Sequence, residues 1–277
     1  MFVSLTRVHA KAVHHLLRNR LPDVPYSATW KDIHRAFELG QVERRRLHFT
    51  PQERELLRDE ARRRFGWDLM NPLPNEDRIQ AAAQAIDEKL APRQPDEGFV
   101  LAKGVLPFMV AAPTLPNECA LRVPVKHLDL AAICNVLVVE NLDCFDQIHR
   151  FALPDRLNAA LVLYRGHSAL TRGTRQLLQG LPALVPVVVF ADFDPAGLAI
   201  AATLPRASHV LIPQLTPDLL AKGSREDFHG QHKESKHLDS IELGGWQAIW
   251  EEMTQTGLSI KQQHLLAQGV PLRCIAR

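Results

Sequence analysis

The chain has 277 residues and 46% hydrophobic content, which is ordinary for a globular protein and leaves room for two domains. It contains no apolar run of 18 residues, and its N-terminus lacks the apolar core of a signal peptide, so we expect a cytoplasmic protein without a membrane segment. The net charge is only +2, and the four cysteines lack the spacing of a metal site, which fits a reducing compartment.

The first part of the chain is predicted to be mainly helical. Apolar residues at helical spacing indicate a helix over residues 5–17, a second is expected over 29–40, and Thr50 with Glu53 forms a capping box that begins a third. A fourth is expected over residues 76–90. The pattern is compatible with a helix-turn-helix and equally with any small helical bundle.

Basic residues are concentrated in this same part of the chain. Residues 1–70 carry fourteen Lys and Arg against nine Asp and Glu. Clustered arginines favour DNA contact, because the guanidinium fork matches phosphate oxygens and binding releases counterions. The interleaved acids leave open a solvated helix face with internal ion pairs. The candidate DNA contacts are Arg44, Arg45, Arg46, Arg62, Arg63 and Arg64.

A linker is predicted at residues 91–98, APRQPDEG, which divides the chain into a helical domain over residues 1–97 and a second domain over 98–277. In the second domain, apolar runs at 133–139, 160–164 and 185–190 are each followed by a helical pattern. This alternation predicts an α/β domain with a parallel sheet, right-handed crossovers and helices on both faces.

Acidic residues follow two of these predicted strands. Glu140 follows the first, and Asp192 and Asp194 follow the third. Because the carboxyl ends of parallel strands meet at one sheet edge, we expect the three carboxylates to converge there. Such like charges are costly unless they are protonated or bridged by a cation, and Mg²⁺ prefers oxygen ligands. A plainer interpretation is that Asp192 or Asp194 caps the helix that Pro195 begins.

Two further stretches carry candidate functional residues. His167 and Arg172 follow the middle strand, close enough to its end to meet a phosphate or, alternatively, to be solvated neighbours of a capped helix. The histidines of the polar stretch at 222–240 could suggest zinc, but they lack cysteine partners and lie among charged residues. We therefore expect this stretch to be a mobile loop that faces the substrate. Trp246 and Trp250 indicate a packed helix after it.

Three motifs together resemble a Toprim domain, the metal-dependent catalytic module of topoisomerases, primases and several nucleases. They are ENLDCF from Glu140, the turn at Gly166, and DFDPAG from Asp192. The last is similar to the topoisomerase VI A subunit. The surrounding sequence from about Phe99 to the end looks more like the JetD family, the nuclease subunit of the Wadjet plasmid-defence system. Lys261, Gln262 and Gln263 stand where that family carries a terminal acidic motif.

The resemblance implies a hydrolase that cuts DNA with Mg²⁺ or Mn²⁺. Asp192 and Asp194 would be the principal metal ligands, and Glu140 a bridging ligand or general acid or base. It also implies double-stranded DNA as substrate, a homodimer, and a complex with an SMC-like ATPase.

Two other functions stay open. A topoisomerase VI A-like transesterase needs an attacking tyrosine, for which the chain offers only Tyr26 and Tyr164. The third function is a non-catalytic nucleic-acid-binding module that has the fold without the activity. The presence of all three acids argues against it.

Overall fold

The computed structural model describes residues 5–73, 96–108, 116–167 and 169–277. The chain divides into two compact units, Met1–Pro95 and Asp96–Arg277, and each contains a hydrophobic core of its own. The helix expected over residues 76–90 and most of the expected linker lie outside the described residues. In the described ranges, no helix is both long enough and apolar enough to cross a membrane.

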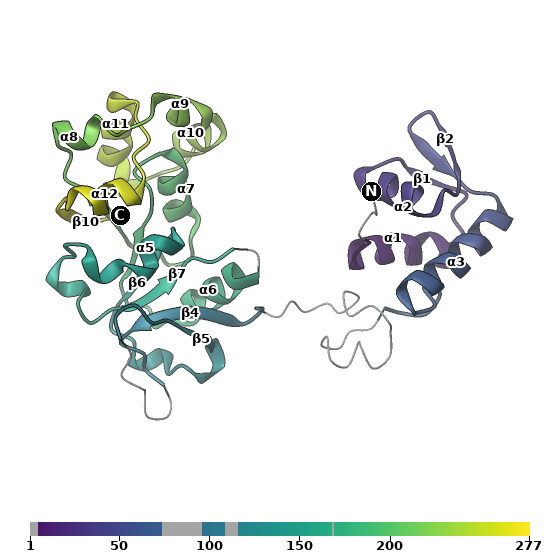
Figure 1. The fold of residues 1–277 in the computed structure, drawn as a ribbon, viewed down its shortest axis with the longest axis horizontal. Coiled ribbons are helices and arrows are strands. Elements are labelled where there is room, and N and C mark those ends of the chain that lie inside the picture. The colour runs from purple at the N-terminus through teal and green to yellow at the C-terminus, as the bar shows by residue number, and fades with distance from the viewer. Residues whose placement is uncertain (1–4, 74–95, 109–115, 168) are drawn as a thin grey trace. The chain divides into compact units, whose positions relative to one another are not determined.

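The first unit combines helices with a small antiparallel sheet (Figure 1). Its described elements are α1 (Arg7–Arg18), β1 (Asp23–Pro25), α2 (Ala28–Phe37), β2 (Gln41–Glu43), β3 (Arg46–His48) and α3 (Pro51–Phe65). The strands lie in the order β1-β3-β2. Sequence patterns predicted the helices but missed this sheet, because strands of three residues are too short to show an alternating pattern.

Packing and capping explain how this unit is held together. The capping box of α3 is present: the Glu53 N–H donates to Thr50 Oγ1 over 3.1 Å, and Glu53 Oε2 accepts from the Thr50 N–H over 2.8 Å. In α1 the core-facing residues differ from the expected stripe, since Val8 is 61% exposed while Ala10 and Val13 are buried. Large buried side chains from all three helices and from β3 complete the core.

The second unit is built on a seven-stranded mixed sheet. Its strands are β4 (Phe99–Gly104), β5 (Leu121–Pro124), β6 (Val136–Val139), β7 (Leu161–Tyr164), β8 (Val187–Phe190), β9 (His209–Pro213) and β10 (Leu272–Ala276). They lie in the order β10-β9-β8-β6-β7-β4-β5. The central strands β9, β8, β6 and β7 are parallel, whereas β10, β4 and β5 pair antiparallel at the two edges.

The expectation of a parallel sheet is therefore correct only for its centre. The central strands are buried on both faces and appear in the sequence as continuous apolar runs. The outermost strands β5 and β10 are partly exposed and lack such runs, so their antiparallel pairing was not foreseen. The α/β class itself is correct.

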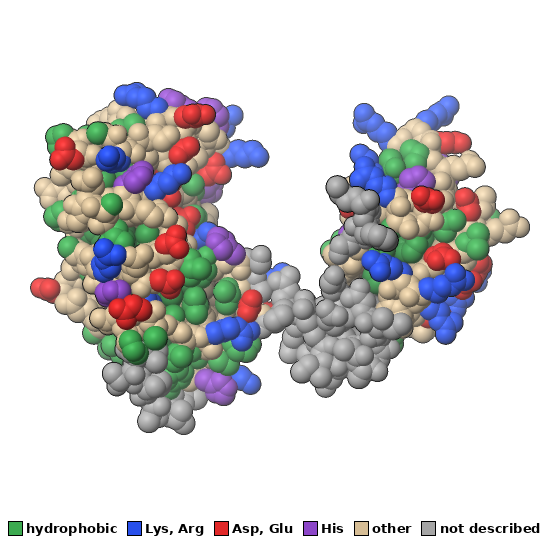
Figure 2. Space-filling view, viewed as in Figure 1, with side chains coloured by type: hydrophobic (Ala, Val, Ile, Leu, Met, Phe, Trp, Pro, Cys, Tyr) green, Lys and Arg blue, Asp and Glu red, His purple; other side chains and the backbone are tan. Residues whose placement is uncertain are grey.

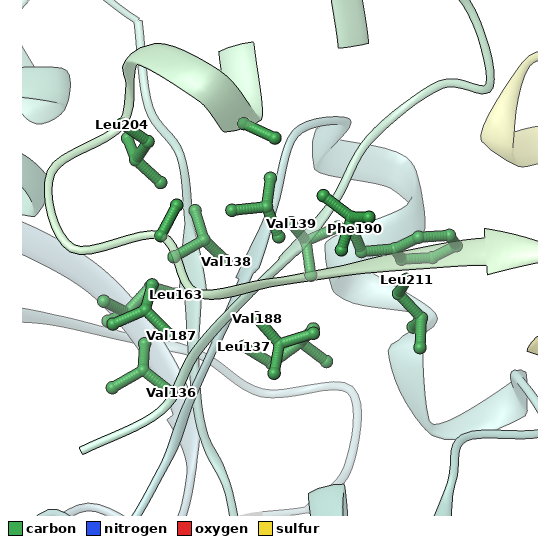
Figure 3. Close-up of a cluster of buried hydrophobic side chains, with 14 of the residues drawn as sticks. Val136, Leu137, Val138, Val139, Leu163, Val187, Val188, Phe190, Leu204 and Leu211 are labelled. Atoms are coloured by element: carbon green, nitrogen blue, oxygen red, sulfur yellow. The ribbon is translucent and has the colours of Figure 1, made fainter. Parts of the chain in front are cut away.

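Helices cover the parallel centre of the sheet. α5 (Leu142–Asp146) connects β6 to β7, α6 (Ala169–Gly180) connects β7 to β8, and α7 (Pro195–Thr203) connects β8 to β9. The chain moves across the sheet in one direction through α5 and in the other through α6 and α7, so crossovers of the usual right hand would place α5 on the face opposite to α6 and α7. The core consists mainly of branched aliphatic side chains from the strands, as Figure 3 shows for Val136 to Val139 and for Val187 and Val188.

The chain after β9 is helical up to β10. It forms α8 (Pro217–Leu220), α9 (Arg225–Gly230), α10 (His232–Asp239), α11 (Gln247–Thr256) and α12 (Gln262–Gln268). The prediction of a loop over residues 222–240 is therefore wrong for most of that range. Leu238, the single large aliphatic residue of α10, is buried, and α10 packs against α7. The packed helix at Trp250 is confirmed, with Ile249, Trp250 and Met253 buried in α11.

Candidate active site at the carboxyl edge of the sheet

The three predicted carboxylates lie where the chain reverses its direction across the sheet. From β6 the chain passes to β7 on one side and then returns to β8 on the other side of β6. Val139 and Phe190, the last residues of β6 and β8, are aligned in register, so Glu140 and Ala191 leave the sheet side by side. In open α/β sheets such a reversal leaves a crevice that is the usual place for a ligand.

Glu140 is fixed beside Asp192 by the backbone. Its N–H donates to the carbonyl of Phe190 over 2.9 Å, and its Oε2 accepts the N–H of Asp192 over 3.3 Å. Its side chain is 21% exposed, and Oε1 lies 3.9 Å from Nη2 of Arg165. Burial raises the pKa of the Glu140 carboxyl, and the neighbouring charge of Asp192 raises it further.

Asp192 is the second half-buried carboxylate of the site. Its Oδ1 accepts the N–H of Gln262 over 2.8 Å. Burial raises its pKa, and repulsion from Asp194 adds to the rise, while that hydrogen bond and the charges of Lys261 and His264 oppose it. Two adjacent carboxyl groups with raised pKa values mark a place where negative charge is held at a cost.

Asp194 serves as the N-cap of α7. It is 3% exposed, and its Oδ1 accepts the N–H of Gly197 over 2.8 Å. Its Oδ2 accepts from Ser259 Oγ over 2.6 Å and from Gln231 Nε2 over 2.9 Å. The capping interpretation therefore holds for this residue, and three hydrogen bonds occupy most of the acceptor capacity of its carboxylate.

Gly197 allows the turn between the two aspartates and α7 to close. A Cβ atom at this position would lie 2.1 Å from the carbonyl oxygen of Asp192, a distance that no side chain tolerates. Pro195 occupies the first turn of α7, where its missing N–H is not needed. Together they hold the end of β8 against the start of the helix.

Gln262 is the functional candidate that sequence reasoning missed. Its backbone N–H binds Asp192, its Oε1 accepts the N–H of Asn141 over 3.1 Å, and its Nε2 donates to the carbonyl of Phe190 over 3.3 Å. The side chain is completely buried. It therefore connects the ends of β6 and β8. The signal was the replaced acidic motif at residues 261–263, which marked this segment as part of the site.

Two hollows meet at Glu140 and Asp192. One has a volume of about 470 Å³, and its lining includes Asp194, Gln231 and Lys261. The other, of about 280 Å³, is lined on its far side by Asn141, Tyr164, Arg165 and His167. Glu140 and Asp192 line both, so the pair is reachable from two sides.

The donor set is compatible with a hard divalent cation held by two carboxylates. No group of three or more His, Cys, Asp or Glu able to hold a metal occurs within residues 5–73, 96–108, 116–167 and 169–277. Glu140 and Asp192 nevertheless line both hollows, and a cation would relieve the charge repulsion that helps to raise their pKa values. Mg²⁺ is commonly bound by one or two carboxylates, with waters and substrate phosphates completing its shell.

The other residues predicted to contact DNA or to attack it do not all lie at this edge of the sheet. His167 is exposed and lines the second hollow, whereas Arg172 lines neither hollow and lies 3.8 Å from Glu97. Tyr164 lines the second hollow, and burial raises the pKa of its phenol. The remaining candidates belong to the first unit: Tyr26, Arg44, Arg45, Arg46, Arg62, Arg63 and Arg64.

Comparison with known proteins gives a family without a known activity. Residues 97–274, almost the whole second unit, match the family described as Domain of unknown function (DUF7281). No curated protein matches the chain.

Proposed function

The chain belongs to the DUF7281 family, a domain of unknown function, and from the site we propose that it is a metal-dependent DNA endonuclease that hydrolyses phosphodiester bonds. One observation carries the proposal. Two half-buried carboxylates with raised pKa values stand side by side at the reversal point of the sheet and line two hollows. Neither burial nor packing explains such a costly pair, whereas a bound cation would compensate its charge and could in turn bind a phosphate.

The chain's own residues would bind, orient and move protons. Mg²⁺ or Mn²⁺, when bound, would neutralise charge on the phosphate and make water a better nucleophile. Asp192 and Glu140 would hold the ion, and Glu140 is also placed to accept or donate a proton because its pKa is raised. Asp194 would add negative charge and fix the turn, since its oxygens are already hydrogen-bonded.

DNA as substrate is supported by the first unit and by the resemblance to the Toprim and JetD families. Figure 2 shows basic side chains over β2 and along α3 of this unit. We further propose that the protein acts on double-stranded DNA as a homodimer, since one carboxylate set cuts one strand, and that it joins an SMC-like ATPase in plasmid defence. Arginines that bind phosphates would hold DNA without reading its sequence.

A thermal-shift and cleavage assay tests the proposal. We expect Mg²⁺ or Mn²⁺ to raise the melting temperature of the wild type, and Asp192→Ala to abolish both this shift and DNA cleavage. Glu251→Gln, which changes an exposed carboxylate of α11, serves as control and should retain both. Equal stabilisation of the wild type and Asp192→Ala by the metal would refute the proposed centre.

A tyrosine transesterase is the second candidate, and one observation favours it: Tyr164 lines the same hollow as Glu140 and Asp192. Its raised pKa makes it a poorer nucleophile, which supports water as the attacking group. If water attacks, Tyr164→Phe and Tyr26→Phe should still cleave, and no protein should remain on the DNA ends. A covalent adduct lost in either variant would establish the transesterase instead. DNA binding without cleavage by the wild type would indicate a non-catalytic module.

A further inference from the structure

Arg165 occupies the same sheet edge as the two carboxylates but has no role in the metal site. We propose that Arg165 binds the two non-bridging oxygens of the substrate phosphate in the hollow between the ends of β6 and β7. This inference rests on the proposed function and adds to it the residue that positions the scissile strand.

The backbone holds Arg165 in place. It follows the last residue of β7, and its N–H donates to the carbonyl of Val139 over 2.8 Å, which continues the ladder with β6. The next residue, Gly166, has a φ of +84°, and a Cβ there would lie 2.7 Å from Leu170. This tight turn ends the strand directly after Arg165 and keeps its side chain at the sheet edge.

Among the residues that the structure describes, none satisfies the guanidinium group of Arg165. Nε is buried without a hydrogen-bond partner, and the distance of 3.9 Å between Nη2 and Glu140 Oε1 is too long for a hydrogen bond. Two other partly buried arginines, Arg58 and Arg206, are satisfied within the chain. Arg58 binds both oxygens of Asp68 over 3.2 and 2.7 Å, and Arg206 donates to three carbonyls over 2.8 to 2.9 Å. A buried donor left open in this way needs a partner, which water or a bound ligand would supply.

The surroundings indicate the chemical class of that ligand. The hollow at Arg165 is also lined by His167 and Asn141, which can donate hydrogen bonds, and it reaches Glu140 and Asp192 on its other side. The guanidinium fork binds phosphate oxygens in bidentate fashion. An anion beside two carboxylates needs compensating positive charge, which Arg165 supplies from one side and a bound cation would supply from the other. A phosphodiester meets both requirements.

A purely structural role would make Arg165 the counterion of Glu140. Its charge does oppose the rise in the pKa of Glu140. That role needs only a positive charge, which lysine would supply, whereas phosphate binding uses the fork of two N–H groups. Lysine and glutamine variants therefore separate the two roles.

The experiment measures phosphate affinity apart from cleavage. The dissociation constant of a short DNA duplex is measured with Ca²⁺ in place of Mg²⁺, and that of inorganic phosphate with metal-free protein, for the wild type, Arg165→Gln and Arg165→Lys. The control is Arg273→Gln, which removes an exposed arginine of β10 that lies 3.8 Å from Glu252. Cleavage with Mg²⁺ is followed in parallel.

We expect Arg165→Gln to weaken both affinities about 10- to 100-fold, the effect of losing a charged hydrogen bond, and Arg165→Lys to recover only part of the loss. The control should stay within about twofold, as rim charges do. Unchanged affinities in Arg165→Gln would overturn the assignment. Full recovery in Arg165→Lys would do so as well, because a counterion would then be sufficient.

The experiment distinguishes a variant that fails to fold, and a failure of the proposed nuclease function, from a failure of the phosphate-binding role of Arg165. If Arg165→Gln does not fold, Arg165→Lys decides alone: weakened phosphate affinity supports the assignment, and wild-type affinity rejects it. If the wild type shows no metal-dependent cleavage, the nuclease proposal fails, while phosphate affinity in metal-free protein still tests Arg165. Cleavage that persists with unchanged duplex affinity in Arg165→Gln keeps the nuclease and rejects only the phosphate-binding role.

Discussion

Glu140 and Asp192 show how a site can oppose the stability of its own fold. Both carboxyl groups lie half-buried beside each other, and both have raised pKa values. A carboxyl group with a folded-state pKa above its unfolded value binds protons more readily in the folded protein, so stability falls as pH rises through the folded-state value. A bound cation would offset the cost of these two negative charges.

Glu140→Gln should therefore stabilise the metal-free protein. The amide removes the buried charge and keeps an acceptor for the N–H of Asp192. We expect a higher melting temperature than wild type at neutral pH and no difference below the ordinary carboxyl pKa of about 4.3, where the wild-type group is protonated in both states. Melting curves across this range test the prediction. An advantage that does not depend on pH would contradict it.

Gln262→Ala should loosen the connection between β6 and β8. It removes the acceptor of the Asn141 N–H and the donor to the Phe190 carbonyl, both at the site. We expect a loss of about 1–3 kcal/mol in the free energy of unfolding, together with weaker stabilisation by Mg²⁺. Gln263→Ala, which changes the exposed neighbour, is the matched control. Urea unfolding with and without Mg²⁺ checks both, and equal effects of the two variants would argue against the role of Gln262.

At the scale of elements, the β2–β3 hairpin carries two arginines in an unusual conformation. Glu43 pairs with Arg46, so Arg44 and Arg45 form a two-residue turn with φ values of +46° and +67°. Such turns favour Asn-Gly. The side chain of Arg46 forms an ion pair with Asp23, so it is less available to DNA than the side chains of Arg44 and Arg45. Arginines at positions where the backbone prefers other residues fit the proposal that this tip contacts DNA.

Arg44→Asn combined with Arg45→Gly should raise stability and lower DNA affinity. Relief of the left-handed conformation is expected to add about 1 kcal/mol to the free energy of unfolding. Loss of two exposed positive charges should weaken duplex binding. Urea unfolding and duplex titration test the two effects separately. If stability rises while affinity stays unchanged, the tip is not a DNA contact.

The end of α3 presents a second basic cluster. Arg62, Arg63 and Arg64 lie in its last turn, where positive charge is favourable, and Arg63 pairs with Glu60 over 2.8 Å. Replacing the three with Ala should weaken duplex binding and flatten its dependence on salt, by about one unit of slope for each phosphate that is no longer bound. Metal stabilisation should be unchanged. The control replaces Arg150, Arg175 and Arg273 with Ala, and an equal change in slope would make α3 an ordinary solvated face.

At the scale of the whole molecule, the proposed nuclease would have one carboxylate set in each chain, which limits what a single chain could cut. A double-strand break needs two sites facing antiparallel strands, and a two-fold dimer matches the symmetry of the duplex. We therefore expect a homodimer at least when DNA is bound. Mass measurement with and without a short duplex tests this expectation. A strict monomer in both conditions would rule out the dimer.

Features that depend on neighbours along the chain could be predicted from the amino-acid sequence alone. The apolar runs ending at Val139 and Phe190 identified buried strands, the acids after them identified one sheet edge, and Thr50 with Glu53 identified the start of α3. Each of these is encoded within a few residues, because capping, burial on both faces and strand-to-helix turns are local.

Distant segments complete the site, and their arrangement emerges only in the folded chain. Gln262 lies far along the chain from Asn141 and Phe190, yet its side chain forms hydrogen bonds with the backbone of both. Gln231 and Ser259 donate hydrogen bonds to the carboxylate of Asp194. The edge strands and the helices at 225–239 likewise depend on tertiary packing. Polar side chains of this kind carry no periodic pattern, because their positions are set by hydrogen bonds between segments far apart in the sequence rather than by their neighbours in the chain.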